Sequence, residues 1–207
     1  MFADVISRNR IMYLLSILHF HDNVLEKNKV EQVEPLLTYF NERCKFIVKP
    51  EKNLSIDEQI IGYKGTTAHT SFWQVMPKKP TKRGFKVWTR CGITAFVYEM
   101  ILHYGLAELD LVKDVPAGSS MFMDNYLASC KLIKTLAQPG YGVTCTVRSN
   151  RLQKCPISTE KQFGKKKRGY YEYFISNDNT CIVVGCKDST RALLGSNHIG
   201  VQTEIKL

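Results

Sequence analysis

The sequence lacks any long apolar run: none of its 207 residues lie in a stretch approaching the roughly 18 apolar residues that span a bilayer. Its N-terminus lacks the pattern of a secretory signal peptide. Its seven cysteines are odd in number and scattered, without a CxxC pair or a zinc-ligand spacing. These absences exclude a membrane protein, a disulfide scaffold and a zinc finger, and predict reduced thiols in an intracellular protein.

Internal repeats and low-complexity linkers are also missing, so the length predicts one compact domain with at most a small helical appendage. Hydrophobic residues make up 44% of the chain, enough for a folded core. Lys and Arg number 29 against 19 Asp and Glu, which gives a formal net charge of +10. The composition therefore indicates a globular, basic protein.

Two stretches, residues 77–86 and 148–168, carry most of the excess positive charge. Clustered cations favour a polyanion, because neutralising phosphates releases condensed counterions. A solvated, soluble face is the alternative for either cluster. The aromatic residues that follow the second cluster are expected to form a strand facing the core, with stacking on bases as the alternative. They are Tyr170, Tyr171, Tyr173 and Phe174.

Apolar periodicity predicts two helices within residues 1–50, one over 8–20 behind an N-cap at Ser7 and one over 34–47 with Pro35 in its first turn. A third helix is predicted from about residue 127 to 137. Strands are predicted at residues 54–63, 85–91, 93–102, 120–123, 143–147, 170–175, 181–185 and 191–195. Strands interspersed with helices predict an α/β domain with a mixed sheet over residues 51–207, preceded by a small helical unit over residues 1–50.

Two acidic residues are candidates for a metal-binding or catalytic role. Asp57 lies inside an otherwise apolar strand, where a carboxylate is costly to desolvate unless it is paired or bound to a cation. Asp124 ends the strand 121–123. Carboxylates at the ends of adjacent strands can share a divalent cation that serves phosphodiester chemistry. The alternatives are a water-facing or lysine-paired acid for Asp57 and a helix N-cap for Asp124.

Seven segments, in register along nearly the whole chain, give a more specific indication. The sequence resembles the piggyBac transposases and the proteins derived from them. The matching segments are residues 6–10 with 18–23 (ISRNR, LHFHDN), 54–59 (LSIDEQ), 77–80 with 84–88 (PKKP, GFKVW), 111–114 (LVKD), 122–126 (FMDNY), 146–151 (TVRSNR) and 194–198 (LGSNH).

This resemblance implies a ribonuclease-H-like catalytic core in which three aspartates bind two Mg²⁺ ions, and DNA that is cut and rejoined at TTAA targets. Asp57 matches the first catalytic and metal-binding aspartate, and Asp124 the second. The family's third aspartate lies beyond the segment matched by residues 194–198. Asp188 is no substitute, because it belongs to a different segment of the family pattern, in which Cys186 stands at a tryptophan position.

The resemblance leads us to expect a transposase-derived, catalytically incomplete DNA-binding remnant, nuclear, with weakened Mg²⁺ binding and a possible homodimer. A fragment of an active transposase and a protein-interaction scaffold are the alternatives. The partner is double-stranded DNA, held by basic and polar side chains of the two charged stretches. These are Lys78, Lys79, Lys82, Arg83, Lys86, Arg148, Asn150, Arg151, Lys165, Lys166, Lys167 and Arg168.

Overall fold

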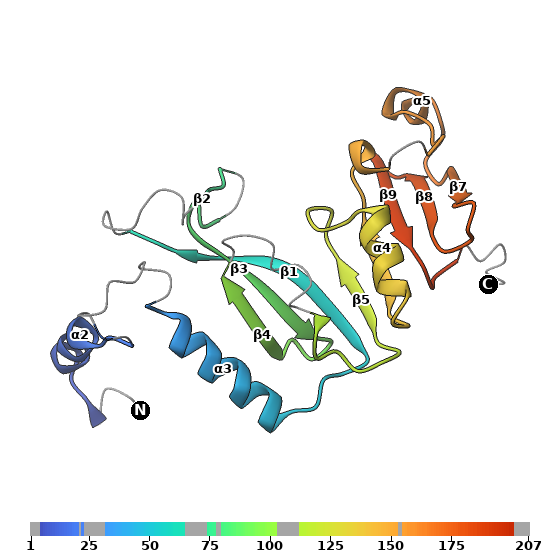
Figure 1. Ribbon diagram of the computed structural model, residues 1–207. Helices are drawn as coiled ribbons and strands as arrows, with labels where there is room; N and C mark the ends of the chain where they lie inside the picture. The colour runs from blue at the N-terminus through green and yellow to red at the C-terminus, as the bar shows by residue number, and fades with distance from the viewer. Residues whose placement is uncertain are drawn as a thin grey trace.

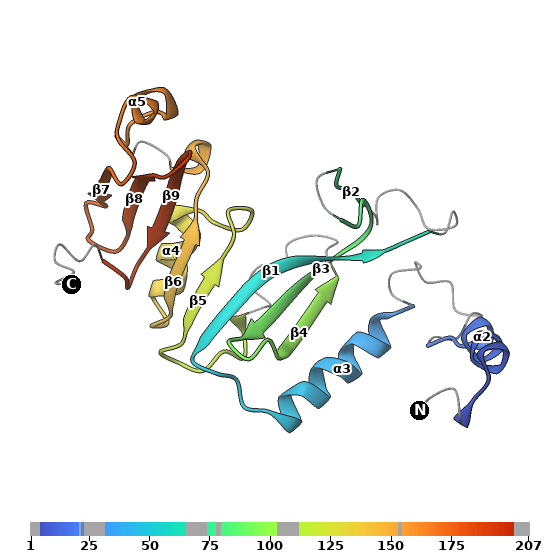
Figure 2. The same ribbon diagram turned by 180° about the vertical axis from the view of Figure 1, so that it is seen from behind.

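The structure, a computed structural model, describes residues 5–20, 22, 32–64, 74–77, 80–102, 112–152 and 155–200, and its elements are seen from two sides in Figures 1 and 2. Lys78 and Lys79, two of the predicted DNA contacts, lie outside these residues. The strands are β1 (Asn53–Gly62), β2 (Gln74–Val75), β3 (Arg83–Gly92), β4 (Val97–Leu102), β5 (Ser120–Met123), β6 (Gly142–Thr146), β7 (Tyr171–Ile175), β8 (Ile182–Lys187) and β9 (Arg191–Ser196). The helices are α2 (Arg8–Ile17), α3 (Glu34–Ile47), α4 (Cys130–Ala137), the 3₁₀ turn η3 (Ser149–Arg151) and α5 (Glu160–Gly164).

All the described strands belong to one sheet, in the order β2-β3-β1-β5-β6-β9-β8-β7, with β4 also paired to β3. Strands β1, β5 and β6 run parallel, whereas the other pairings are antiparallel. The predicted mixed α/β sheet is therefore confirmed. The strands predicted at residues 85–91 and 93–102 correspond to β3 and β4, which form a hairpin whose turn places Ala95 in the left-handed region at a φ of 61°.

Helices α3 and α4 cover opposite faces of the sheet. Side chains alternate along a strand, so neighbours on β3 point to opposite faces. Val87 packs with Leu37 of α3, whereas Trp88 belongs to the main core together with Ile133 of α4. Figure 1 shows α3 running beside β4, and α4 packs against β6 and β9. The sheet is thus the middle layer of the fold.

The edge of the sheet where α3 docks holds a buried ion pair. Arg90 is fully buried, and its Nη2 lies 3.1 Å from Oε2 of Glu99 on the paired strand β4. Lys45 of α3 approaches the other oxygen of Glu99 at 3.5 Å. The Asn41 side chain exchanges two hydrogen bonds with the Met100 backbone, at 3.0 and 2.9 Å. These polar contacts attach α3 to the sheet, and the predicted division at residue 50 stays a prediction.

Some predicted elements differ from the observed ones. The first helix ends at Ile17 instead of residue 20, and none of its residues is buried. The prediction of a core-facing aromatic strand is wrong for Tyr171 and Tyr173, which are 47% and 46% exposed. Because side chains alternate and β7 is the last strand of the sheet, only its other face, with Glu172 and Phe174, is partly covered.

No helix among the described residues combines the length and the apolar character that crossing a membrane requires. All seven cysteines are free thiols, in agreement with the prediction from their spacing.

Candidate metal centre

The register of three parallel strands places the two aspartates side by side. Ile56 of β1 is paired with Met123 of β5, and Met123 is in turn paired with Cys145 of β6. One residue further along each strand come Asp57, Asp124 and Thr146. Because these strands run in the same direction, the three residues form a row where β5 and β6 end. Ligand sites of open α/β sheets commonly lie at the carboxyl ends of strands.

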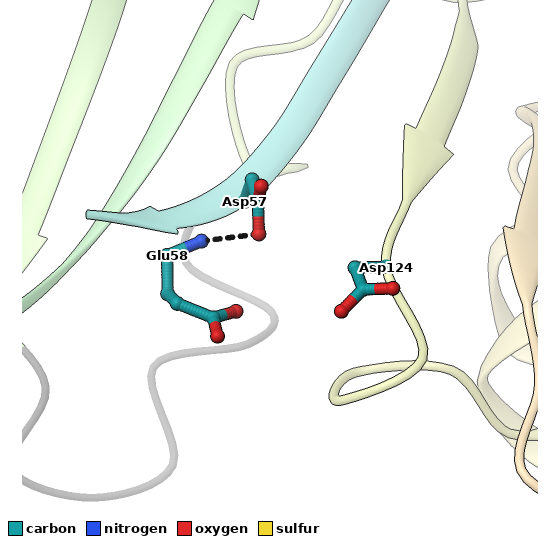
Figure 3. A group of neighbouring side chains, drawn as sticks. All are labelled: Asp57, Glu58 and Asp124. Atoms are coloured by element: carbon teal, nitrogen blue, oxygen red, sulfur yellow. Dashed lines mark hydrogen bonds between the residues drawn. The ribbon is translucent and has the colours of Figure 1, made fainter. Parts of the chain in front are cut away.

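The two aspartates of this row and the neighbouring Glu58 bring their carboxylates close together. Ligand oxygens of Asp57, Glu58 and Asp124 all lie within 4.8 Å of one another, as Figure 3 illustrates. Asp57 Oδ1 accepts a hydrogen bond from the Glu58 amide at 2.7 Å, and Asp124 Oδ1 accepts one from the Thr146 hydroxyl at 2.8 Å. Carboxylate oxygens are the donors that Mg²⁺ and other hard divalent cations prefer, so the donor set fits the implied ion.

The structure excludes the helix N-cap alternative for Asp124 and agrees with the water-facing alternative for Asp57. The N-cap of α4 is Ser129, whose side chain accepts from the Leu132 amide at 3.1 Å, so Asp124 does not cap that helix. Asp57 is exposed, and the expectation of a desolvated carboxylate inside the sheet is wrong: its side chain points away from the core that Ile56 joins. Solvent access leaves the clustered carboxylates reachable by a hydrated cation.

Two arginines predicted to bind DNA hold the loop that carries Asp124. Arg151 is half-buried, and its guanidinium donates to the Tyr126 carbonyl. Arg148 is exposed, and its Nε donates to Oδ1 of Asn125, the neighbour of Asp124, at 2.7 Å. Arg148 therefore brings positive charge next to the acidic cluster, whereas Arg151 contributes by fixing the loop.

The prediction that Lys86 contacts DNA does not agree with its position, because its side chain is buried. It is 2% exposed. Its Nζ lies 3.5 Å from the ring centroid of Tyr126 and 4.4 Å from that of Trp88. Cation–π contact and burial explain why the charge faces the interior. A lysine enclosed in this way is not part of an exposed basic surface.

Among the described residues, the remaining predicted DNA contacts are exposed or half-buried. Lys82, Asn150 and the run from Lys165 to Arg168 are exposed, and Arg83 is half-buried with its guanidinium 5.9 Å from the Tyr63 ring centroid. Arg168 forms an exposed ion pair with Asp188 at 2.6 Å. The four residues from Lys165 to Arg168 directly follow α5 and make the longest exposed cationic run among the described residues.

The sequence patterns gave no role to two residues of the site, Glu58 and Thr146. Glu58 was read only as part of the segment that carries Asp57, because alternation along a strand assigns it to the opposite face. The pairing of β1 with β5 stops at Ile56, so no described strand lies beside Glu58 on that side of β1. The longer Glu58 side chain therefore reaches the carboxylates of Asp57 and Asp124. Thr146 became recognisable only through its hydrogen bond to Asp124.

Comparisons with known proteins agree with the motifs. The family described as Transposase IS4 matches residues 1–202. Human PiggyBac transposable element-derived protein 2 is 28% identical over 222 residues, covering 97% of this chain and 37% of the human protein. Human PiggyBac transposable element-derived protein 3 is 26% identical over 219 residues, covering 94% of this chain and 35% of the relative. The chain thus spans about a third of the length of these relatives.

A solved structure supports the fold. A piggyBac transposase in a synaptic complex with hairpin DNA superimposes with a TM-score of 0.81 at 23% sequence identity, covering 99% of this chain and 46% of that chain. The similarity confirms the predicted ribonuclease-H-like arrangement of the mixed sheet.

Proposed function

Because the chain belongs to the piggyBac transposase family, we propose that its acidic cluster binds a divalent cation and that its basic surfaces hold DNA beside it. The observation that carries the proposal is the convergence of Asp57, Glu58 and Asp124 within 4.8 Å at the strand ends. A hard cation held there supplies Lewis-acid activation of a phosphodiester. Asp57 and Asp124 are the proposed ligands, and Glu58 completes the carboxylate cluster.

The protein residues around the cluster have separate tasks in this proposal. Thr146 donates to Asp124 and thereby fixes the orientation of one carboxylate. Arg148, tied to Asn125, is placed to meet a phosphate that approaches the cluster. Lys82, Asn150 and the run from Lys165 to Arg168 are proposed to contact the DNA backbone farther out, giving binding that depends on salt and little on sequence.

We further propose that this stretch binds DNA without cutting it. The resemblance implies three catalytic aspartates, of which Asp57 and Asp124 correspond to two. Removing one ligand from a two-metal site costs several kcal/mol of transition-state stabilisation, which lowers the rate by orders of magnitude. A nuclear location follows from DNA as the partner, and a homodimer stays a prediction that sedimentation can test.

Replacing either aspartate by asparagine is expected to weaken cation binding about tenfold or more, because an amide oxygen carries no formal negative charge. The measurement is a Mn²⁺ titration of the purified chain, followed by the loss of the free-ion signal in electron paramagnetic resonance. Glu42→Gln, which removes an exposed acid of α3, is the matched control and should bind as the wild type does. Unchanged affinity in both D57N and D124N would overturn the metal site.

Thr146→Val is expected to weaken Mn²⁺ binding roughly tenfold, since partners that orient metal ligands typically contribute about 10–100-fold to affinity. The substitution removes the 2.8 Å hydrogen bond to Asp124 while keeping the β-branched shape that suits a strand. The nearby Thr144→Val, whose hydroxyl contacts Ser196 instead, is the control. Equal affinities in the two variants would show that Thr146 does not position Asp124.

Strand cleavage separates the DNA-binding remnant from the active-transposase alternative. Supercoiled plasmid incubated with the chain and Mg²⁺ or Mn²⁺ is expected to be shifted on a gel yet remain un-nicked. Nicking that is present in the wild type and lost in D124N would establish the enzyme instead. Absence of any shift at low salt would contradict the DNA-binding proposal and favour the interaction scaffold.

A further inference from the structure

A second group of chemically active side chains lies away from the acidic cluster, between α4 and the β7–β8 hairpin. A pocket of about 250 Å³ is lined there by three cysteines, Cys130, Cys155 and Cys181, together with Lys134. Cys181 is buried at 3% exposure, and Cys130 is half-buried. A small polar molecule that enters this pocket therefore meets thiols from two different elements.

Cys130 has the surroundings of a thiolate. It is the first residue of α4, directly after the N-cap Ser129. The Cys181 thiol lines the same pocket, and Lys134 lies one helical turn further along; together, against some opposing burial, these neighbours lower the pKa of Cys130 to about 6. Lys134 is held by an ion pair with Asp178 at 2.6 Å. A thiolate is the reactive form of cysteine.

The neighbouring cysteines have the opposite character. The neighbouring Cys130 and burial raise the pKa of Cys181, so Cys181 keeps its proton while Cys130 is ionised. Burial raises the pKa of Cys145 to about 12, and burial also raises the pKa of Cys155. One charged sulfur thus stands among protonated thiols, which is the arrangement of an attacking and a resolving cysteine.

We propose that Cys130 and Cys181 form a peroxide-sensitive thiol pair that closes a disulfide between α4 and the start of β8. The Cys130 thiolate attacks one oxygen of hydrogen peroxide, the O–O bond breaks, and hydroxide leaves, so sulfur is oxidised to a sulfenic acid and peroxide is reduced. The Cys181 sulfur then attacks the sulfenic sulfur, and the S–O bond breaks. The leaving hydroxide takes the Cys181 proton and forms water.

The second step follows from the first for an electrostatic reason. The neighbouring Cys130 thiolate, together with burial, raises the pKa of Cys181. A sulfenic acid is neutral, so oxidation of Cys130 removes this charge and makes deprotonation of Cys181 easier at the moment when it must attack. Joining α4 to β8 leaves the row of Asp57, Asp124 and Thr146 untouched, because neither cysteine contacts those side chains in the described contacts.

The test uses the complete chain in its reduced form. Iodoacetamide labelling near pH 6.5, followed by mass spectrometry, is expected to modify Cys130 at least tenfold faster than Cys91, a half-buried cysteine of β3 with a raised pKa that serves as an internal control. Peroxide should lower the number of free thiols from seven to five. It should also yield one cross-linked peptide that joins residues 130 and 181.

Two variants separate the steps. Cys181→Ser should accumulate a dimedone-reactive sulfenic acid at Cys130 without a disulfide, and Cys130→Ser should leave Cys181 reduced at the same peroxide dose. Cys186→Ser, on β8 outside the pocket, should oxidise as the wild type does. Labelling of Cys130 no faster than of Cys91 in the wild type would overturn the proposal, as would a disulfide that persists in Cys130→Ser.

Discussion

Glu99→Gln is expected to lower the free energy of unfolding by about 3–5 kcal/mol, because removing one partner of a buried ion pair leaves the other charge uncompensated. Arg90 is fully buried, and its guanidinium lies 3.1 Å from the Glu99 carboxylate. The glutamine keeps the shape of Glu99 but not its charge. Urea unfolding followed by circular dichroism measures the change.

Two further variants make this prediction specific. Lys45→Met removes the more exposed cation beside Glu99 and should cost about 1 kcal/mol or less, as exposed pairs do. The paired replacement Arg90→Met with Glu99→Leu should recover much of the lost stability, since apolar residues of similar volume replace buried ion pairs at little cost. An equal loss in Glu99→Gln and Lys45→Met would refute the buried-charge explanation.

Replacing Lys165, Lys166 and Lys167 together with glutamine is expected to flatten the salt dependence of DNA binding. Each neutralised phosphate contributes about 0.9 to the slope of log K against log salt concentration, so three lost contacts reduce its magnitude by up to about 3. All three lysines are exposed beside α5. Fluorescence anisotropy with a labelled duplex, repeated at several salt concentrations, measures the slope.

The matched control removes the same charge elsewhere. Lys49, Lys52 and Lys131 are exposed and lie outside the predicted DNA-binding stretches, so their triple replacement by glutamine keeps the slope near the wild-type value. If both triple variants flatten the slope equally, the binding depends on net charge alone, and the run after α5 is not a DNA contact.

Local features could be predicted well because neighbouring residues decide them. Helix α3 occupies the predicted residues 34–47, since its apolar spacing and its early proline act within a few turns. Helix α5 was missed, yet a local signal exists: Thr159 and Gln162 form a capping box. Except for the two-residue strand β2, which the sequence analysis does not predict, the described strands lie within a few residues of their predicted positions, because alternation is readable along the chain.

Lys86 and Arg151 show what local reasoning leaves out. Both lie in basic stretches, for which the sequence predicts DNA contacts. Lys86 lies against the rings of Trp88 and Tyr126, and Arg151 donates to a backbone carbonyl of the loop after Asp124. Aromatic rings and carbonyls brought close by folding decide whether a cation faces solvent, and a charge count along the chain does not contain that information.

The amino-acid sequence by itself determined the family, the mixed α/β class and the two aspartates, because motifs and periodicity are properties of the chain. Only the tertiary structure decided that Asp57 and Asp124 meet, that Glu58 and Thr146 join them, and that Cys130 and Cys181 line one pocket. The physical reason is the parallel pairing of β1 with β5 and of β5 with β6. Such pairing joins residues that are distant along the polymer, and a strand's own sequence does not specify its partner.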